Sequence, residues 1–579
     1  MDKREITFDR DLMYKHNCFN FIGKDEPGGK AASLILMKDT VDKAFEDNKF
    51  EDIAVSIPNM TVILTDIFDI FMEENNLYEI AFSDESDDVI ANKFQKASLP
   101  AIINGDLYSL ISKIHKPLAV RSSSLSEDKM FEPFAGVFET KMIPNNQFDT
   151  KTRFNKLVEA IKFIYASAFF SKSKNYFRAI KKDIKDEKMA VVIQEIVGER
   201  YKDRFYPTIS GVARSYNFYP MGNSKPEHGV VSLALGLGKS IVDGGKVWSF
   251  SPQFPASPPP YNNINDMLKM TQTDFWTVNM GQIRDYNPIK ETEYLENHSI
   301  TKAEEDKVIR NICSTYDGQS DRMNMGTFGY GPRLLNFAPI LKARILPLNE
   351  LLKKIMKISE EKFGNKVEIE FAMVYDPDNY HQTRFSLLQV RPMVVSNTMV
   401  EVNVEDFEEE QIMAFSNKAL GNGIIEEIDE IVFVKPEDFE LKNTINIAQE
   451  IAEINSEIVK RDSNYVLIGF GRWGTSDPWL GIPIVWNQIS GAKIIIESAL
   501  PQIRADYSQG SHFFHNLTSF EIFYFSCNNL GKNKVDWDWL SKQKCVNETK
   551  YVKHIKLGKP LQILTDGRSG NGVILKKKD

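Results

Sequence analysis

The sequence predicts a mixed α/β protein with a large N-terminal unit and a smaller C-terminal unit of mixed α/β or β-rich character. From about residue 10 to residue 150, short apolar runs typical of strands alternate with helical stretches, which is the pattern of α/β folds. Apolar residues then recur at helical spacing between 154 and 164 and predict a long amphipathic helix against a sheet. Strand-like runs at 482–486 and 521–525 indicate that the C-terminal part folds as well.

The composition is that of a globular protein with an acidic balance. The chain has 579 residues, of which 42% are hydrophobic and 11% aromatic, so it can bury a substantial core. A formal net charge of -9 argues against a general nucleic-acid binder, which usually carries a strongly basic face. No apolar stretch follows the charged start at residues 1–5, and no run approaches the ~18 apolar residues that span a bilayer. We therefore expect a cytoplasmic protein with neither a membrane nor a nucleic-acid partner.

The four cysteines indicate a reducing compartment. Cys18, Cys313, Cys527 and Cys545 are scattered along the chain and form no CxxC pair, so neither a disulfide framework nor a zinc ribbon is expected. We expect all four to be packing residues.

A glycine-rich segment, PGGKAASL at 27–34, is typical of a loop that opens a helix. It places Lys30 in the first helical turn. Unpaired backbone N–H groups and the helix dipole favour phosphate at this point of a helix. The segment therefore predicts contact between Lys30 and an anionic ligand.

A second segment, AVRSSS at 119–124, is an apolar strand that delivers Arg121 beside small hydroxyl residues. The loop PFAGVFET follows at 133–140 and supplies Thr140 and Gly136, where backbone can approach a ligand closely. This setting suits a nucleoside triphosphate, because a planar guanidinium binds phosphate oxygens in pairs. Taken alone, the strand is equally compatible with an ordinary sheet edge.

Two further runs, VEIEF at 367–371 and LLQVRP at 387–392, are expected to form paired strands. Because side chains alternate along a strand, Glu368 and Glu370 share one face, as do Gln389 and Arg391. Oxygen ligands beside an arginine are what a hard cation that bridges phosphates requires.

Together these segments resemble the nucleotide-binding domain of the phosphoenolpyruvate synthase and pyruvate, phosphate dikinase family, which is an ATP-grasp domain. The matching segments occur in the family's order: GGKAASL, AVRSSSLSED, PFAGVFET, VVIQEIV, LALGLGKSIVDGG, EIEF and QVRP. The resemblance implies a two-lobed nucleotide-binding domain over 1–395, with lobes at about 1–190 and 191–395. A C-terminal domain of unknown role follows at 396–579.

The residues and the resemblance together imply a site for ATP and Mg²⁺. Lys30 and Arg121 are expected to neutralise phosphate charge, and Arg391 to clamp the transferring group. The expected nucleotide-binding residues are Lys30, Arg121, Gly136, Thr140, Gln194, Glu195, Val197, Glu368 and Arg391. The expected magnesium ligands are Glu370 and Gln389. Arg121 and Arg391 are the expected catalytic residues.

Two of the matching segments leave alternatives open. By resemblance Gln194 lies near the nucleotide, at the hinge between the lobes; without the other motifs it reads as the mouth of a plain interior strand. Lys239 stands where the family usually has Glu. It either contacts phosphate or faces water.

The family cleaves ATP to AMP by pyrophosphorylating a histidine on a swivelling domain, and the β-phosphate then passes to a small acceptor. About 180 residues follow residue 400, too few for both a histidine domain and a barrel of ~250 residues that would bind pyruvate. The family signature GGxxSHxAI is absent. We therefore expect ATP and an unidentified acceptor, either a small molecule or a protein histidine, as partners.

The C-terminal part contains two segments of interest. The loop GFGRWGTSDP at 469–478 either holds an anion or is a compact turn anchored by Trp473, and the sequence favours the turn. His512 follows a Gly-Ser pair that faintly echoes the family signature, so one hypothesis makes it the phosphoacceptor. Packing or hydrogen bonding is the more common role for such a histidine, and a metal site is less expected for want of further ligands nearby in sequence.

The leading functional hypothesis is a dikinase-like, ATP-dependent phosphotransferase without a pyruvate barrel. A regulatory module that senses nucleotide without turnover is an alternative, and so is an ATP-binding subunit that works with a separate histidine carrier chain. Retention of the charged residues favours chemistry over sensing.

Overall fold

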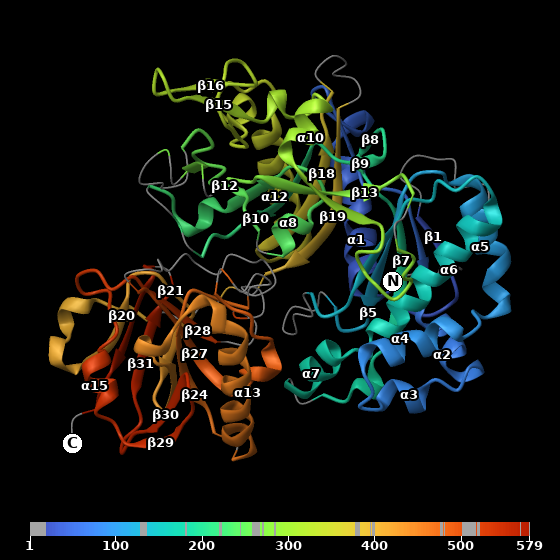
Figure 1. Cartoon of the computed structure of the whole chain (residues 1–579). Coiled ribbons are helices and arrows are strands. Elements are labelled where there is room, and N and C mark those ends of the chain that lie inside the picture. Colours follow the sequence, from blue (N-terminus) through green and yellow to red (C-terminus); the bar gives the residue numbers. More distant parts are fainter. Residues whose placement is uncertain are drawn as a thin grey trace. The chain divides into compact units, whose positions relative to one another are not determined.

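The computed structural model describes residues 19–127, 136–179, 182–218, 220, 223–243, 245–257, 264, 267–268, 271–282, 285–376, 383–393, 395, 400–461, 463–474, 479, 481–500, 517, 522–567 and 569–577. The chain divides into two compact units (Figure 1). The first comprises Met1–Phe177, Lys182–Asn217 and Met221–Met393, and the second comprises Arg178–Lys181, Phe218–Pro220 and Val394–Asp579. Both contain helices and strands, so the predicted mixed α/β class is confirmed. Among the described residues, no helix is both long and apolar enough to cross a membrane.

The first unit contains a five-stranded sheet that presents Arg121. Its strands, in spatial order, are β1 (Phe19–Ile22), β4 (Met60–Ile63), β7 (Met189–Glu195), β5 (Leu118–Ser124) and β6 (Thr140–Ile143). β1 and β4 are parallel, and the other pairs are antiparallel. The strands predicted at 119–124 and 189–194 are thus neighbours in this sheet.

Helices follow the strands of this sheet along the chain. They are α2 (Thr65–Glu74), α3 (Tyr78–Phe82), α4 (Asp87–Lys96), α5 (Ala101–Lys113), α6 (Thr150–Ser167) and α7 (Ser171–Ala179). The helix predicted at 154–164 is the central part of α6. Asp149 caps α6, because its side chain accepts a hydrogen bond from the backbone N–H of Thr152 at 2.8 Å. Leu157, Ile161 and Ile164 are fully buried on its inner face.

A seven-stranded sheet forms the second layer of the first unit. Its order is β12 (Trp248–Phe250), β11 (Val230–Ala234), β10 (Ile209–Arg214), β18 (Val367–Val374), β19 (Arg384–Pro392), β3 (Ile53–Ser56) and β2 (Lys49–Phe50). β18 and β19 are antiparallel neighbours, as predicted. β3 pairs with β19 in parallel register, so a hairpin from the N-terminal part of the chain completes this sheet.

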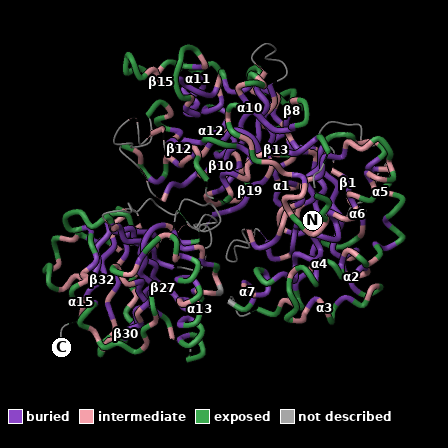
Figure 2. Tube along the Cα trace, viewed as in Figure 1, coloured by how far each residue is buried: buried purple, intermediate pink, exposed green. Residues whose placement is uncertain are grey.

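Helix α1 (Gly28–Ala44) packs against strands of both sheets and against helix α12 (Leu348–Phe363). Its buried face is formed by Ala31, Leu34, Met37 and Val41, at the spacing that places side chains on one side of a helix. These residues belong to a core that also includes the buried sides of the second sheet. Figure 2 shows buried positions concentrated along the strands and exposed ones on the outer helices and loops.

Further strands of the first unit form two smaller sheets. One sheet has the order β14 (Leu295–Ser299), β13 (Asp274–Asn279), β9 (Arg204–Tyr206) and β8 (Glu199–Tyr201). Another has the order β16 (Arg322–Met325), β15 (Ser314–Asp317) and β17 (Arg333–Leu334). The short helices α8 (Lys239–Val242) and α10 (Ile300–Glu305) lie between these strands in sequence, and α11 (Ala338–Leu341) follows β17.

The second unit is built on two main sheets. The larger has the order β21 (Ala419–Leu420), β28 (Phe523–Cys527), β27 (Ala492–Ser498), β24 (Tyr465–Phe470), β23 (Glu430–Val434), β30 (Val552–Lys556) and β29 (Cys545–Glu548). The smaller has the order β20 (Ile412–Ser416), β32 (Asn571–Leu575), β31 (Gln562–Asp566) and β22 (Asn422–Ile425). Helix α13 (Thr444–Lys460) buries Ile447, Ile451, Ile454 and Ile458 in a core with β24 and β27, and α15 (Trp537–Ser541) is a short helix near the end.

The second unit departs from one sequence prediction. The strand expected at 521–525 is present as β28, but the strand expected at 482–486 is reduced to β26 (Gly481–Ile482), which pairs with β25 (Arg472–Trp473). Pro483 follows directly and cannot donate to a strand ladder. Trp486 then begins a short 3₁₀ turn.

The cysteines are only partly packing residues. Cys313 and Cys527 are fully buried, as expected, and burial raises the pKa of the Cys313 thiol to about 12. Cys545 is exposed, so the prediction is wrong for this residue. It lies on β29, at the edge of the larger sheet, where one side of a strand faces solvent. Cys18 lies outside the described residues.

Candidate nucleotide site

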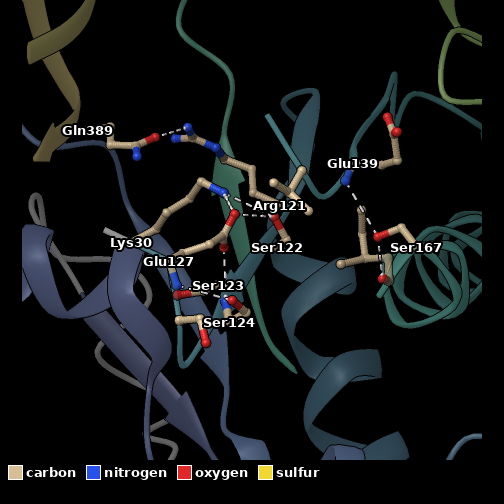
Figure 3. A network of polar contacts seen from close by, with 12 residues as sticks. Lys30, Arg121, Ser122, Ser123, Ser124, Glu127, Glu139, Ser167 and Gln389 are labelled. Atoms are coloured by element: carbon tan, nitrogen blue, oxygen red, sulfur yellow. Dashed lines mark hydrogen bonds and ion pairs between the residues drawn. The ribbon is translucent and has the colours of Figure 1, made fainter. Parts of the chain in front are cut away.

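Arg121 joins the two large sheets of the first unit. It lies on β5, and its guanidinium reaches the second sheet, where Nη2 donates to Gln389 Oε1 at 2.7 Å and Nη1 donates to the Leu388 carbonyl at 3.0 Å. Nη2 also lies 3.4 Å from Glu370 Oε2. Figure 3 shows Arg121 and Gln389 pointing toward each other. Residues more than 240 positions apart in the chain therefore meet at one guanidinium.

The register of β18 and β19 explains why these acceptors lie together. Glu370 pairs with Gln389, and Glu368 pairs with Arg391, with the Ile369–Val390 pair between them. The predicted sharing of faces is therefore confirmed. A register shift follows Glu370, and such a bulge locally re-aims side chains. Two oxygens, Glu370 Oε2 and Gln389 Oε1, are left directed at the same Arg121 nitrogen.

This pair of oxygens fits a hard cation only in part. Carboxylate and amide oxygens are suitable magnesium ligands, but an octahedral ion needs more than two of them. Within the described ranges, no group of three or more His, Cys, Asp and Glu side chains is arranged to hold a metal. A magnesium ion at Glu370 and Gln389 would therefore take its remaining ligands from phosphate oxygens and water.

Two residues further along the same face of the strands lies a buried ion cluster. Glu368 Oε1 accepts a hydrogen bond from Arg391 Nη2, and Glu368 Oε2 accepts one from Arg214 Nε on β10. Glu368 is 2% exposed and Arg391 is 3% exposed. Both oxygens of Glu368 are thus committed to arginines, and a buried carboxylate needs such partners.

The glycine loop docks on β5 through Ser123. Gly28 begins α1 with a φ of 72°, and a Cβ placed there would lie 1.7 Å from the Ser123 carbonyl oxygen. Only glycine permits this approach. The Ser123 hydroxyl donates to the Pro27 carbonyl at 2.8 Å and accepts from the Ala31 N–H at 3.1 Å. The start of α1, with Lys30 in its first turn as predicted, is thereby fixed against the strand that carries Arg121.

Lys30 and its partners form a compact group beside Arg121 (Figure 3). Lys30 Nζ donates to Ser122 Oγ at 3.0 Å and forms an ion pair with Glu127. Ser122 Oγ also donates to Glu127 Oε1 at 3.1 Å, and the Ser124 N–H donates to Glu127 Oε2 at 2.9 Å. Each serine of the strand therefore holds a neighbouring part of the site: Ser122 and Ser124 contact Glu127, and Ser123 contacts the start of α1.

The first residue of β6 also lies next to Arg121. Thr140 is the direct cross-strand neighbour of Arg121 in the pairing of β5 and β6. Gly136 adopts a φ of 65°, a conformation that glycine reaches without strain. Residues 128–135, which include the start of this loop, lie outside the described part of the chain.

The predicted hinge residues point to both faces of β7. Gln194 is 2% exposed, and its Oε1 lies 3.4 Å from Arg121 Nη1; its Nε2 has no hydrogen-bond partner among the described residues. The side chain of Glu195 lies on the opposite face, where it pairs with Lys116 at 2.8 Å. The backbone N–H of Glu195 donates to Asn59 and that of Ile196 to Pro117. Glu195 is thus turned away from Arg121, and half-exposed Val197 continues the chain past this point.

Sequence reasoning missed an apolar group at this hinge. Ile196, Ala119 of β5 and Leu237 of the glycine segment belong to one buried cluster, with Met142 and Trp276 packed against it. These residues come from three different strands and two loops, so no local pattern announces them. An apolar wall beside charged groups is the usual composition of a small-molecule site.

Lys239, for which the sequence allows contact with phosphate or with water, is paired with carboxylates. Its Nζ lies 3.1 Å from Asp243 and 3.4 Å from Glu291, and the side chain is 18% exposed. Although burial alone would lower it, these two carboxylates hold the pKa of Lys239 above its ordinary value. Burial raises the pKa of Glu291, and the nearby Glu139 adds to that rise.

In the second unit, the loop at 471–474 is a compact turn anchored by Trp473. The indole is 1% exposed, its Nε1 donates to the Ile496 carbonyl at 3.3 Å, and its backbone N–H donates to Glu497 at 3.0 Å. The favoured sequence interpretation therefore holds for the described part of this loop. His512 lies outside the described residues.

Of the predicted residues, the structure brings Arg121, Gln194, Glu370 and Gln389 into direct contact, with Lys30 and Thr140 beside them.

Residues 24–411 match the sequence model of a family described as pyruvate phosphate dikinase, AMP/ATP-binding domain. The match covers more than half of the chain, so the chain belongs to this family. Its first unit is an ATP-binding domain, followed by a further domain.

The chain is also similar to part of a bacterial protein. The chain is 27% identical over 199 residues to a protein named uncharacterized phosphotransferase YvkC from Bacillus subtilis (strain 168). This match covers 32% of the present chain and 20% of the relative, so the chain spans about a fifth of that protein. The family and this relative support ATP-dependent phosphotransfer at the level of the family.

Proposed function

We propose that the protein is an ATP-dependent phosphotransferase of dikinase type that binds magnesium-ATP between the two large sheets of its first unit. In this proposal the sheets are the lobes of an ATP-grasp domain. The observation that carries the proposal is the meeting of Arg121, Glu370 and Gln389, which come from distant segments, beside the Lys30 group.

Each residue has a distinct part in phosphoryl transfer, which depends mainly on positioning and charge neutralisation. Lys30 and Arg121 neutralise the triphosphate, with the first turn of α1 adding backbone N–H donors. Thr140 and Gly136 close the loop over the phosphates. Glu370 and Gln389 hold the magnesium ion, which when bound supplies charge stabilisation to the phosphate oxygens.

Arg391 clamps the transferring group from the floor of the site. Its ion pair with Glu368 fixes the guanidinium, so Glu368 contributes to nucleotide binding through Arg391. The base packs against the apolar cluster at the hinge. There the buried Gln194 Nε2, which lacks a partner among the described residues, donates to it, and backbone groups of Glu195 and Val197 meet its edge.

The acceptor is a small molecule or a histidine, on this chain or on a separate carrier. Incubation with magnesium-ATP distinguishes the possibilities by product. AMP supports a dikinase, ADP an ordinary kinase, and tight binding of unchanged ATP a regulatory module that senses nucleotide. If a histidine of this chain is the acceptor, His512 is the candidate; acid-labile phosphate label that persists in His512→Ala excludes it.

A further inference from the structure

The buried carboxylate of Glu127 lies at the centre of a small polar group that the roles above leave unexplained. The carboxylate is 2% exposed, and the Lys30 side chain with which it pairs is 16% exposed. Its oxygens are occupied from two sides: Oε1 by Lys30 and Ser122, and Oε2 by the Ser124 N–H. Both oxygens are thus engaged by donors of the protein, and the carboxylate is almost inaccessible to a ligand, yet it holds a residue that is expected to contact one.

We propose that Glu127 is a positioning residue of the nucleotide site, which aims the Lys30 ammonium at the phosphates without contacting the nucleotide. This inference rests on the proposed function. A lysine side chain has several rotatable bonds and loses conformational freedom when it binds a ligand. Glu127 and Ser122 fix that side chain before the nucleotide arrives, which is the advantage of a preorganised site.

The donor count of Lys30 agrees with this role. An ammonium group carries three N–H donors. Two of them are directed at Ser122 and Glu127, and the described residues provide no third acceptor. One donor is therefore left for a phosphate oxygen, in a direction set by the other two.

The backbone around Glu127 keeps the carboxylate in place. Its own N–H donates to the Ser124 hydroxyl at 3.2 Å, while the Ser124 N–H donates back to the carboxylate. This reciprocal pair ties Glu127 to the end of β5. Ser122, which contacts the Lys30 ammonium, and Arg121 lie on the same strand. Strand β5 therefore helps to position both cationic side chains of the site, Lys30 and Arg121.

Glu127→Gln tests the idea because a glutamine amide accepts hydrogen bonds at one end only. Either the Lys30 ammonium or the Ser124 N–H must then face an NH₂ group. Small misplacements of binding groups cost up to about 100-fold in function. We expect magnesium-ATP to bind about 10- to 100-fold more weakly to Glu127→Gln, as measured by calorimetric titration.

A double-mutant cycle separates positioning from a general structural role. If Glu127 acts through Lys30, Glu127→Gln causes no further loss of ATP affinity in a Lys30→Met background. Independent, multiplying losses in the double variant would overturn the inference. If Glu127→Gln does not fold, Ser122→Ala replaces it in the same cycle, with an expected loss of roughly threefold to tenfold that again disappears beside Lys30→Met.

Glu187→Gln is the matched control. Glu187 is a buried carboxylate held by Ser126 in the same region, and no contact joins it to Lys30 among the described residues. We expect Glu187→Gln to bind ATP with the affinity of the wild type. An equal loss of affinity in Glu187→Gln and Glu127→Gln would show that Glu127 acts only on the fold. Failure of the wild type to bind magnesium-ATP overturns the proposed function and this inference together. Weakening by Lys30→Met but not by Glu127→Gln overturns the inference alone.

Discussion

Arg121→Lys is the sharpest test of how the two sheets cooperate. It preserves the positive charge and removes the fork of nitrogens that reaches the second sheet. The guanidinium spans four acceptors, at 2.7 Å from Gln389, 3.0 Å from the Leu388 carbonyl, and 3.4 Å from both Glu370 and Gln194. A lysine has a single terminal nitrogen, so it keeps only some of these contacts.

The expected magnitude follows from the two short bonds. Each hydrogen bond to a charged group contributes about 1.5–3 kcal/mol in a buried setting, and the Arg121 side chain is 13% exposed. Losing one of them destabilises the first unit by about 2 kcal/mol. Misplacing the charge lowers turnover by about 10²- to 10³-fold, as for the loss of one transition-state donor; Arg121→Ala is expected to abolish the reaction.

The assay is the release of AMP or ADP from radiolabelled ATP in the presence of magnesium, with thermal unfolding measured in parallel. Arg384→Lys is the control, because Arg384 lies on β19 and its pair with Glu199 is 43% and 46% exposed. Solvent screens such a pair, so unfolding and turnover should be nearly unchanged. Undiminished turnover in Arg121→Lys and Arg121→Ala would refute the assigned site.

Three further predictions concern stability. Gly28→Ala forces a Cβ to within 1.7 Å of the Ser123 carbonyl and should destabilise the first unit by on the order of 3 kcal/mol, seen as a lower thermal midpoint with weakened ATP binding. Trp473→Ala removes a fully buried ring from the second unit and should cost about 3–5 kcal/mol, measured by circular dichroism during chemical unfolding; a change below ~1 kcal/mol would contradict its anchoring role. Burial raises the pKa of Glu187 above its ordinary value of 4.5. The contribution of Glu187 to the free energy of unfolding is therefore fully present below pH 4.5 and is lost as the pH rises through the folded-state pKa. Glu187→Gln should therefore gain stability relative to the wild type as pH increases from 4.5; a pH-independent difference in urea midpoints would contradict this.

The parts of the site that depend on local pattern were predictable from the sequence. Alternation along a strand placed Glu370 beside Glu368 and Gln389 beside Arg391, and the structure confirms their pairing in β18 and β19. The glycine loop likewise predicted a helix that begins next to Lys30. In both cases the period of the element decides where the side chain points.

Several ion pairs between residues far apart in the chain were not predictable. Arg214 pairs with Glu368 from 154 positions away, and Glu127 pairs with Lys30 from 97 positions away. Nothing in the neighbourhood of Glu368 or Glu127 distinguishes a carboxylate that binds a ligand from one that holds an arginine or a lysine. The role of Lys239 was undecidable for the same reason, because Glu291 lies 52 positions further on.

One signal was present and overlooked. Pro483 falls inside the apolar run at 482–486 and limits its pairing to β26. The exposure of Cys545 has a different origin, since it depends on the position of β29 at a sheet edge, which the order of strands in space determines.

The hairpin of β2 and β3 has a consequence for synthesis of the protein. Ser56 on β3 lies beside Ser386 on β19, 330 positions later in the chain. At translation rates of roughly 5–20 residues per second, β3 waits on the order of 20–60 seconds on the ribosome before its partner strand emerges. During that interval the unpaired edge and the apolar side chains of β3 must be protected by the nascent chain itself or by a chaperone. The two large sheets of the first unit therefore cannot fold one after the other in the order of the sequence.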